Sequence, residues 1–230
     1  MRKDKFITLL PIMVLGLFVS SAANATVISA GGGSFVQSFG KGSGTDDTQT
    51  YGQSITVPTD NVLDSFSFWL GKTSTTFPDP TNPSLSFMAY VYEWNGTMAT
   101  GSALYTSGVY THNAAPDSPF IEYTFNTGGL SLTTGDTYAL FLSTSGLTGD
   151  GHIQWESATA DEYLGGNFIF LNNGEDITKF TTDPWGSGIA SDLHFEAVFS
   201  GSTTVPEPAT LALLSLGLAG LGINRRKRVS

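Results

Sequence analysis

The chain has 230 residues, contains no cysteine and carries a formal net charge of −10. Without cysteine it cannot form disulfide bonds, use thiol chemistry or hold zinc through sulfur ligands. Residues 26–205 contain three lysines and 18 of the 20 acidic residues, because only Asp4 and Glu207 lie outside, so this part carries a charge of −15. Such a surface repels phosphate backbones, which argues against nucleic-acid binding.

The first 25 residues predict a secretory signal peptide. A basic start over residues 1–5 precedes an apolar run from Phe6 to Val19, and Ala23 and Ala25 form a small-x-small cleavage site. We therefore expect the mature chain to begin at Thr26. The alternative is an N-terminal membrane anchor, which the well-placed cleavage site disfavours.

Residues 26–200 predict one all-β domain. Segments in which apolar and polar residues alternate recur there, separated by turn-forming residues, as expected for sheets with one buried face. The clearest strands are 63–70, 85–94, 120–125, 137–143 and 192–199, and weaker candidates are 53–57, 103–110, 152–156 and 167–171. About ten strands at this spacing predict a two-sheet antiparallel sandwich of the jelly-roll type.

The alternation also predicts which residues face the core and where the chain turns. The inward set is Phe66, Phe68, Leu70, Leu85, Phe87, Ala89, Val91, Ile121, Tyr123, Phe125, Tyr138, Leu140, Leu142, Leu193, Phe195, Ala197 and Phe199. Glycines supply turns at 95–96, 127–129, 134–136 and 172–174, and the proline-rich segment 77–83 predicts an exposed loop. The Gly-rich stretches at 31–33 and 40–44 predict a flexible flank, and residues 201–205 predict a linker.

Several segments of the predicted domain resemble a known group of proteins. They are Gln53–Ile55, Leu63–Phe68, Val91–Trp94, Gly101–Tyr105, Tyr123–Phe125 and Gly135–Leu140. Their order over residues 50–155 is similar to that in the choice-of-anchor β-sandwich domains of bacterial surface proteins. The resemblance implies a jelly-roll-like fold and surface display, and it brings no established catalytic residues.

The C-terminus has three parts in order: the motif Pro206-Glu207-Pro208, an apolar stretch over 209–223, and the basic cluster Arg225, Arg226, Lys227 and Arg228. The apolar stretch is shorter than the roughly 20 residues of a comfortable membrane span. By the positive-inside tendency the basic cluster stays cytoplasmic while the domain before it is exported.

This arrangement, over residues 206–228, resembles the PEP-CTERM sorting signal, which the membrane protease exosortase recognises in Gram-negative bacteria. The resemblance implies a short hydrophobic sorting helix that anchors the chain transiently in the inner membrane. It also implies processing near the motif, with release or attachment at the cell surface. The alternative is a plain C-terminal membrane tail.

The sequence offers no recognised catalytic motif. His112, His152 and His194 have no metal-ligand spacing, and His194 is expected to be solvated on the polar face of the last strand, between Asp192 and Glu196. Gly186-Ser187-Gly188 predicts a short turn rather than a nucleophile elbow. A carboxylate pair is the remaining enzymatic hypothesis, with Glu93 and Glu156 next to Trp94 and Trp155.

Two ligand hypotheses follow from the same residues. Trp94 and Trp155 could stack on sugar rings as glycan contacts, although an aromatic stripe on a sheet is more often core. The pairs Asp46-Asp47, Asp161-Glu162 and Glu175-Asp176 could hold Ca²⁺ or could simply be solvated loop carboxylates. No other cofactor is expected.

Together these observations predict an exported, non-catalytic cell-surface or extracellular-matrix protein, sorted by an exosortase-like system. Glycan binding and association with exopolysaccharide or biofilm are the functional hypothesis. The alternative is a secreted glycan-active hydrolase that uses a carboxylate pair.

Overall fold

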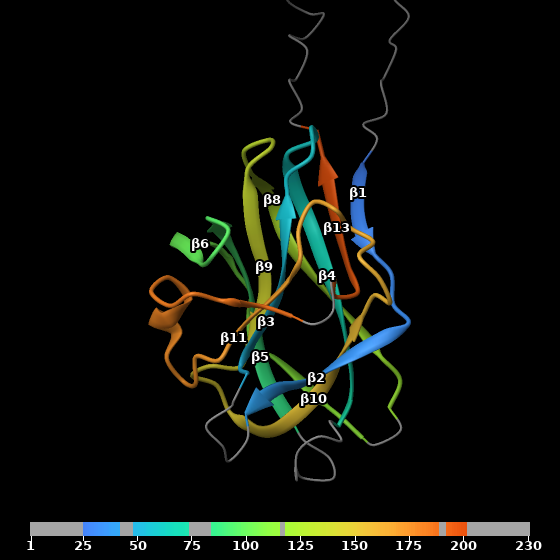
Figure 1. Cartoon of the computed structure of the whole chain (residues 1–230), viewed down its shortest axis with the longest axis vertical. Helices are drawn as coiled ribbons and strands as arrows, with labels where there is room; N and C mark the ends of the chain where they lie inside the picture. Colours follow the sequence, from blue (N-terminus) through green and yellow to red (C-terminus); the bar gives the residue numbers. More distant parts are fainter. Residues whose placement is uncertain (1–24, 42–47, 74–83, 116–117, 189–191, 202–230) are drawn as a thin grey trace, which may run out of the picture.

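The computed structural model describes residues 25–41, 48–73, 84–115, 118–188 and 192–201. These residues form thirteen strands and one short 3₁₀ helix. The strands are arranged as two antiparallel sheets packed as a sandwich, as the sequence predicts (Figure 1). Residues 1–24 of the predicted signal peptide, the predicted loop at 77–83 and the predicted sorting helix lie outside the described residues.

The first sheet is built around the long strand β4 (Val62–Thr73). On one side β4 pairs with β8 (Ile121–Ser131), and on the other it pairs with β13 (Phe195–Ser200) and then β10 (Gly149–Ser157). Strand β1 (Thr26–Ala30) continues the sheet beside β13, and β2 (Ser34–Lys41) continues it beside β10. β1 and β2 therefore form one edge of this sheet, and β8 forms the other.

The second sheet has β5 (Ser84–Trp94) and β9 (Thr137–Ser143) near its centre. β5 also pairs with β6 (Ala99–Thr106) and β7 (Tyr110–Asn113). Beyond β9 follow β3 (Thr50–Thr56), β11 (Phe168–Leu171) and the two-residue strand β12 (Gly186–Ser187). A 3₁₀ helix, η1 (Ile177–Phe180), lies between β11 and β12 in the chain. The start of β10 pairs with the start of β5 and so connects the two sheets.

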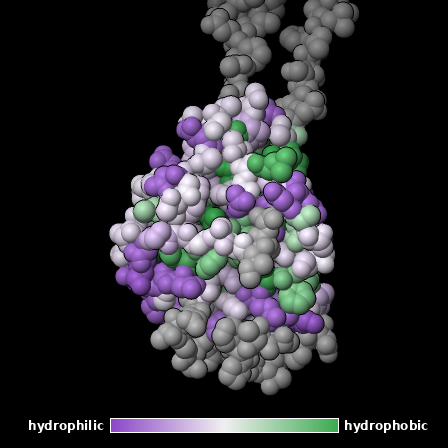
Figure 2. Space-filling model, viewed as in Figure 1, coloured by the Kyte–Doolittle hydropathy of each residue, from purple (hydrophilic) through white to green (hydrophobic). Residues whose placement is uncertain are grey.

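The predicted inward residues form most of the core. Phe66, Phe68 and Leu70 of β4 are at most 1% exposed, as are the inward residues of β5 and β13. β9 is buried on both faces, because Ala139 and Phe141 pack outward into a second apolar cluster. On the face drawn in Figure 2, hydrophobic residues gather in separate patches among hydrophilic ones.

The prediction was wrong for part of β8, although Phe125 is buried as expected. This strand continues through the expected turn at 127–129, because Gly128 and Gly129 adopt positive φ angles of 76° and 86° and form a bulge opposite β4. The hydroxyl of Thr127 donates to the carbonyl of Leu63 and holds the bulge in place. Ile121 is 42% exposed rather than inward. The predicted turns at Gly96, Gly135 and Gly174 are confirmed by positive φ angles.

Part of the expected flexible opening belongs to the sandwich, because Gly40 lies in β2, whereas residues 42–44 lie outside the described residues. Phe39 of β2 is fully buried, and β2 pairs with β10 along most of its length. Gly40 lies against the carbonyl of Gly151, where a Cβ atom would clash. Glycine is therefore needed at position 40 because the backbones of β2 and β10 approach each other closely there, and not because this segment is flexible.

Among the described residues, which leave out 1–24 and 202–230, no helix has the length and apolar character that a membrane crossing requires.

Candidate functional site

The sandwich opens into a cleft of about 740 Å³ between β2, at the edge of the first sheet, and β11 and β12, at the edge of the second. We call this space the edge cleft. Residues 34–38 of β2 form one wall and the ends of β10 and β3 form the floor. Residues of β11 and β12 form the other wall. β2 and β12 are edge strands, and β11 is the strand next to β12, so the cleft lies where the edges of the two sheets do not close.

Aromatic rings line the floor and one wall of the edge cleft. Tyr51 packs edge-on against Phe168, with ring centroids 5.0 Å apart, and Phe170 lies beyond it at 6.5 Å. Burial raises the pKa of Tyr51 well above its usual value, so this hydroxyl stays protonated. Phe35 stands at the rim and is 47% exposed. Tyr51 and Phe168 are only 6% and 3% exposed, so the ring surface that a ligand can reach is mainly that of Phe35 and Phe170.

Two glycines bring β12 close to this aromatic wall. A Cβ atom at Gly188 would clash with the ring of Phe168, and one at Gly186 would clash with the ring of Phe170. The segment Gly186-Ser187-Gly188 was predicted as a turn, but residues 186 and 187 form strand β12, paired with β11. Its glycines are needed because the backbone runs directly over the rings.

β2 contains a strained bulge where it borders the edge cleft. Ser38 has a φ angle of 79°, and among the described residues it is the one non-glycine residue with positive φ. Two residues of β2, Gln37 and Ser38, stand opposite one residue of β10 at this point. The Tyr51 hydroxyl donates to the carbonyl of Gln37 and fixes the bulge. Such strain costs about 1–3 kcal/mol and is concentrated at functional sites.

A buried hydroxyl lies at the inner end of the edge cleft. Ser157 ends β10, lines the cleft and is only 1% exposed. Its Oγ atom has no hydrogen-bond partner among the described residues. An unsatisfied buried hydroxyl costs about 1–3 kcal/mol, so this one is unusual for a purely structural position.

The lining of the edge cleft is uncharged. Its polar side chains are hydroxyls and amides, namely Ser34, Ser38, Thr48, Ser157, Thr159, Ser187, Gln37 and Asn172. No Asp, Glu, Lys, Arg or His lies among the described residues that line it. This neutrality contrasts with the charge of −15 carried by residues 26–205.

A smaller hollow of about 340 Å³ surrounds Trp94 at the end of β5. Glu93 and Asp136 both line it, together with Thr100 and Tyr138. The indole of Trp94 packs edge-on against Trp185, with ring centroids 5.5 Å apart. Trp94 is partly exposed here, so the structure leaves it available as a ligand contact.

Trp155 cannot be a glycan contact in this structure, so that part of the sequence hypothesis is wrong. Its side chain is fully buried, with Phe39 and Phe68 both at ring-centroid distances of 4.9 Å. The reason lies in the alternation of β10, since Trp155 shares the inward face with Ile153. Its neighbour Glu156 points to the opposite face.

The predicted carboxylate pair is not formed. Glu93 lines the hollow beside Trp94, whereas Glu156 lies in the first sheet and contacts Nδ1 of His194 at 2.8 Å. His194 is not simply solvated, because its ring stacks on Trp69 at 3.7 Å with an interplanar angle of 4°. Its side chain is 22% exposed.

The other predicted polar positions are also engaged in the fold. Asp192 is fully buried and accepts hydrogen bonds from Nε2 of Gln53 and from the backbone N–H groups of Glu162 and Tyr163. His112 is buried in β7, where one ring nitrogen lies 2.7 Å from the carbonyl of Gly71. Burial lowers the pKa of His112. His152 is buried in β10.

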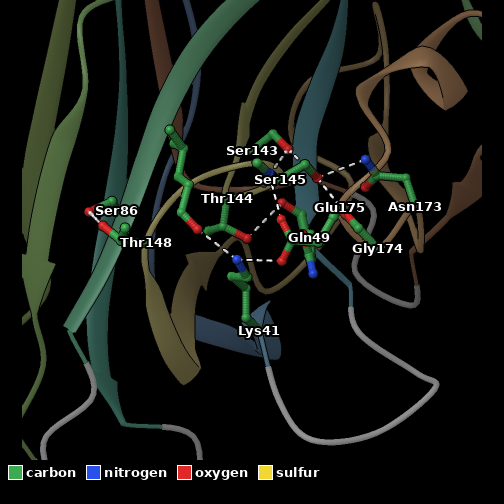
Figure 3. A network of polar contacts seen from close by, with 12 residues as sticks. Lys41, Gln49, Ser86, Ser143, Thr144, Ser145, Thr148, Asn173, Gly174 and Glu175 are labelled. Atoms are coloured by element: carbon green, nitrogen blue, oxygen red, sulfur yellow. Dashed lines mark hydrogen bonds and ion pairs between the residues drawn. The ribbon is translucent and has the colours of Figure 1, made fainter.

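Three of the four described carboxylates proposed for Ca²⁺, namely Glu162, Glu175 and Asp176, have protein partners. Figure 3 shows Lys41, at the end of β2, reaching Glu175 across the loops. Burial favours a raised pKa for Glu175, but hydrogen bonds from Lys41 and from the Gly146 N–H outweigh it and hold the pKa below its usual value. Asp176 caps η1 through the N–H of Thr178.

In the other described pair, Glu162 accepts a hydrogen bond from the Gly31 N–H at 2.8 Å. Asp46 and Asp47 lie outside the described residues. Within the described residues, no group of three or more His, Asp or Glu side chains is placed to hold a metal ion.

Comparison with known protein families gives one match. The model of the PEP-CTERM protein-sorting motif matches residues 204–228, which contain Pro206-Glu207-Pro208 and the basic cluster. The predicted sorting signal is thereby confirmed. This signal directs export across the inner membrane to the cell surface or the extracellular space. No curated protein matches the chain.

Similarities to solved structures are weak. One is to the cysteine protease and lectin-like domains of Cwp84, a surface layer associated protein of Clostridium difficile, with 11% identity and a TM-score of 0.39. It covers 67% of this chain and 32% of that one. The structures of infectious bursal disease virus strains Gt and Gx match with 12% identity and TM-scores of 0.34 and 0.33. Both matches cover 94% of this chain. They cover 54% of the matched chain in the Gt structure and 52% of it in the Gx structure. At these scores the similarities carry no functional argument.

Proposed function

We propose that the exported domain is a non-catalytic surface or matrix protein that binds a neutral polysaccharide of the exopolysaccharide layer in the edge cleft. The observation that carries this proposal is the chemistry of the cleft, which combines aromatic rings with an uncharged rim of hydroxyls and amides. The sorting motif supports the location, because it delivers the domain to the compartment where such polymers lie.

A neutral sugar chain matches each part of this lining. Its apolar C–H faces bury against aromatic rings, and its hydroxyls exchange hydrogen bonds with serine, threonine and amide side chains. An acidic polymer would approach a domain of charge −15 with no cation in the described lining of the cleft. Long-range repulsion therefore favours neutral polymers over acidic ones.

The absence of acid–base groups in the described lining supports a binding role for the cleft. General acid–base catalysis needs a group whose pKa lies near the working pH. The titratable group that lines the cleft is Tyr51, and burial raises its pKa. The hydrolase alternative loses its proposed pair, because Glu93 and Glu156 have separate surroundings.

Processing of both ends belongs to the same proposal. We expect signal peptidase to cut after Ala25, and an exosortase membrane enzyme to remove the tail near Pro206–Pro208. The intact mass of the exported protein tests this. A chain that starts at Thr26 and lacks the basic cluster is the expected result, and a retained tail would contradict exosortase processing.

Binding of the exported protein to purified neutral polysaccharide from its own host, measured by titration calorimetry, tests the function. We expect saturable binding that weakens at least tenfold, equivalent to about 1.4 kcal/mol, in Phe35→Ala. Phe35 is exposed at the rim, so this variant should fold normally. The matched control is Val109→Ala, which removes a side chain of 59% exposure that does not line the cleft.

The hollow at Trp94 provides the competing site. If the edge cleft is the binding site, Trp94→Ala should leave the affinity unchanged. Loss of binding in Trp94→Ala but not in Phe35→Ala would move the site to the hollow. Release of reducing ends from the polysaccharide, lost in Glu93→Gln, would instead support the hydrolase alternative.

A further inference from the structure

The unsatisfied hydroxyl of Ser157 limits which part of a ligand can enter the edge cleft most deeply. Ile153, Trp155 and Ser157 lie two residues apart in β10, so all three side chains are on its inward face. The first two lie in the core. Ser157 is the position on this face that reaches the cleft. At 1% exposure it can meet only a small group, and its Oγ–H has no partner among the described residues.

The surroundings of Ser157 favour a group with one acceptor and an apolar side. Ala158, Phe168 and Tyr51 line the same cleft with methyl and ring surface. The Ser157 hydroxyl can donate one hydrogen bond, and a carbonyl oxygen is a compact acceptor that an apolar group can carry.

The acceptor must be uncharged. A carboxylate, as in a uronic acid, could also accept from Ser157. It would bring a negative charge into a lining that has no described cation, within a domain of charge −15. Desolvation of such a charge without a partner is strongly unfavourable. A neutral carbonyl attached to a methyl group meets both the donor and the apolar walls.

A sugar derivative fits the cleft better than an extended peptide, which also has carbonyls. A peptide that adds to a sheet needs a regular strand edge along which to form a ladder of hydrogen bonds. The edge of β2 is interrupted by the bulge at Ser38, and β12 has only two residues. Neither wall offers a continuous ladder.

We infer that the edge cleft recognises the acetyl group of an N- or O-acetylated neutral polysaccharide, with the Ser157 hydroxyl donating to the acetyl carbonyl. This inference rests on the proposed function and names the substrate class of the same site. The methyl of the acetyl group lies against the aromatic wall, and the sugar ring stays in the wider, hydroxyl-lined part of the cleft.

The test compares two neutral ligands that share a β-1,4-linked hexose backbone. The exported protein is titrated with N-acetylchitohexaose and with cellohexaose, which has a hydroxyl where the first has an acetamido group. The host polysaccharide, before and after mild alkali that removes O-acetyl esters, forms a second pair. We expect the acetylated member of at least one pair to bind ten times more tightly or better.

Ser157→Ala provides the residue-level test. In this variant the acetylated and unacetylated ligands should bind with nearly equal affinity. The affinity for the unacetylated ligand should stay within twofold of that of the unmodified protein. The matched control is Ser187→Ala, which removes an exposed hydroxyl from the rim and should keep the preference. Because Ser157→Ala deletes an unsatisfied polar group, its thermal midpoint should not fall.

The outcomes separate the inference from the function on which it rests. Equal binding of acetylated and unacetylated ligands, or a preference that survives in Ser157→Ala, overturns the inference and leaves glycan binding intact. Binding of no saccharide contradicts the proposed function as well. Saturable binding of a neutral peptide in place of saccharides overturns both.

Discussion

Two aromatic clusters lie on opposite faces of β11, and only one of them borders the edge cleft. Ile169 and Leu171 point into a closed cluster with Phe141, Phe180 and Trp185. Phe168 and Phe170 point the other way, into the edge cleft. We call the first the covered cluster. Composition does not distinguish the two, since both are built from rings and aliphatic side chains.

What distinguishes them is how their polar atoms are satisfied. In the covered cluster, Nε1 of Trp185 donates to the carbonyl of Phe180 at 3.0 Å, and the capped helix η1 supplies Phe180. In the edge cleft, Ser157 is buried without a partner among the described residues, and Ser38 keeps a strained backbone. Aromatic content alone is therefore a poor guide to a binding site. An unsatisfied polar group beside exposed ring surface is a better one.

The largest expected effect is on the stability of the covered cluster. Phe180→Ala removes a ring that is 2% exposed and contacts Phe141 and Trp185, so unfolding should become easier by about 3–5 kcal/mol. Denaturant unfolding measures this. Ile177→Ala, on the exposed side of the same helix, is the control. The saccharide affinity of the folded variant should not change. A decrease of less than about 1 kcal/mol in the free energy of unfolding would contradict the assigned role of the cluster.

The next effect is on the edge cleft. Gly188→Ala places a methyl group against the ring of Phe168, which must move. We expect at least a tenfold loss of saccharide affinity, with a stability cost of about 1–3 kcal/mol from overpacking. Gly108→Ala is the control, because nothing lies within 4 Å of its Cβ position. Unchanged affinity in Gly188→Ala would show that the aromatic wall does not contact the ligand.

Ser38→Gly is expected to stabilise the protein. A glycine adopts a φ angle of 79° without the steric cost that serine bears, so the gain is on the order of 1 kcal/mol. Thermal unfolding measures it. The same variant should bind saccharide more weakly, since the wall of the cleft becomes less rigid. A stabilised variant with unchanged affinity would make the strain at Ser38 irrelevant to binding.

The smallest effect concerns the ion pair that joins the two regions. Lys41 ends the β2 wall of the cleft, and Glu175 belongs to the segment that leads to η1. Because the pKa of Glu175 is lowered in the folded state, its contribution is present above the usual glutamate pKa and is lost as the pH falls through the folded value. Glu175→Gln should therefore lower the melting temperature slightly at pH 7 and not at pH 3. Glu122→Gln, at an exposed position on β8, is the control.

The alternation of apolar residues was enough to predict most of the sandwich. In strands β4, β5 and β13, the residues that the alternation of apolar and polar positions predicts to face the core are buried. The same rule applied to β10 would have placed Trp155 inward with Ile153. The glycan hypothesis for Trp155 rested on its neighbour in sequence, Glu156, which lies on the opposite face of the strand. Adjacency in sequence is misleading in a strand, since neighbours point to opposite faces.

The edge cleft could not be predicted from the sequence, because it depends on which strands end at the sheet edges. β2 lies in a Gly-rich segment that resembles a flexible flank, and β12 in one that resembles a turn. Phe168 and Phe170 belong to a weakly patterned strand that is apolar on both faces. The burial of Ser157 follows only from the packing of the two sheets.

The most direct test of the binding proposal is an NMR titration of the exported protein with N-acetylchitohexaose. We predict that the shifted backbone amides cluster at residues 34–38, 157–159 and 186–188, around the edge cleft. Amides at 93–100 and 135–138, around Trp94, should remain unchanged. Shifts confined to the Trp94 hollow, or no shifts with either N-acetylchitohexaose or the host polysaccharide, would contradict the assignment of the edge cleft as the glycan site.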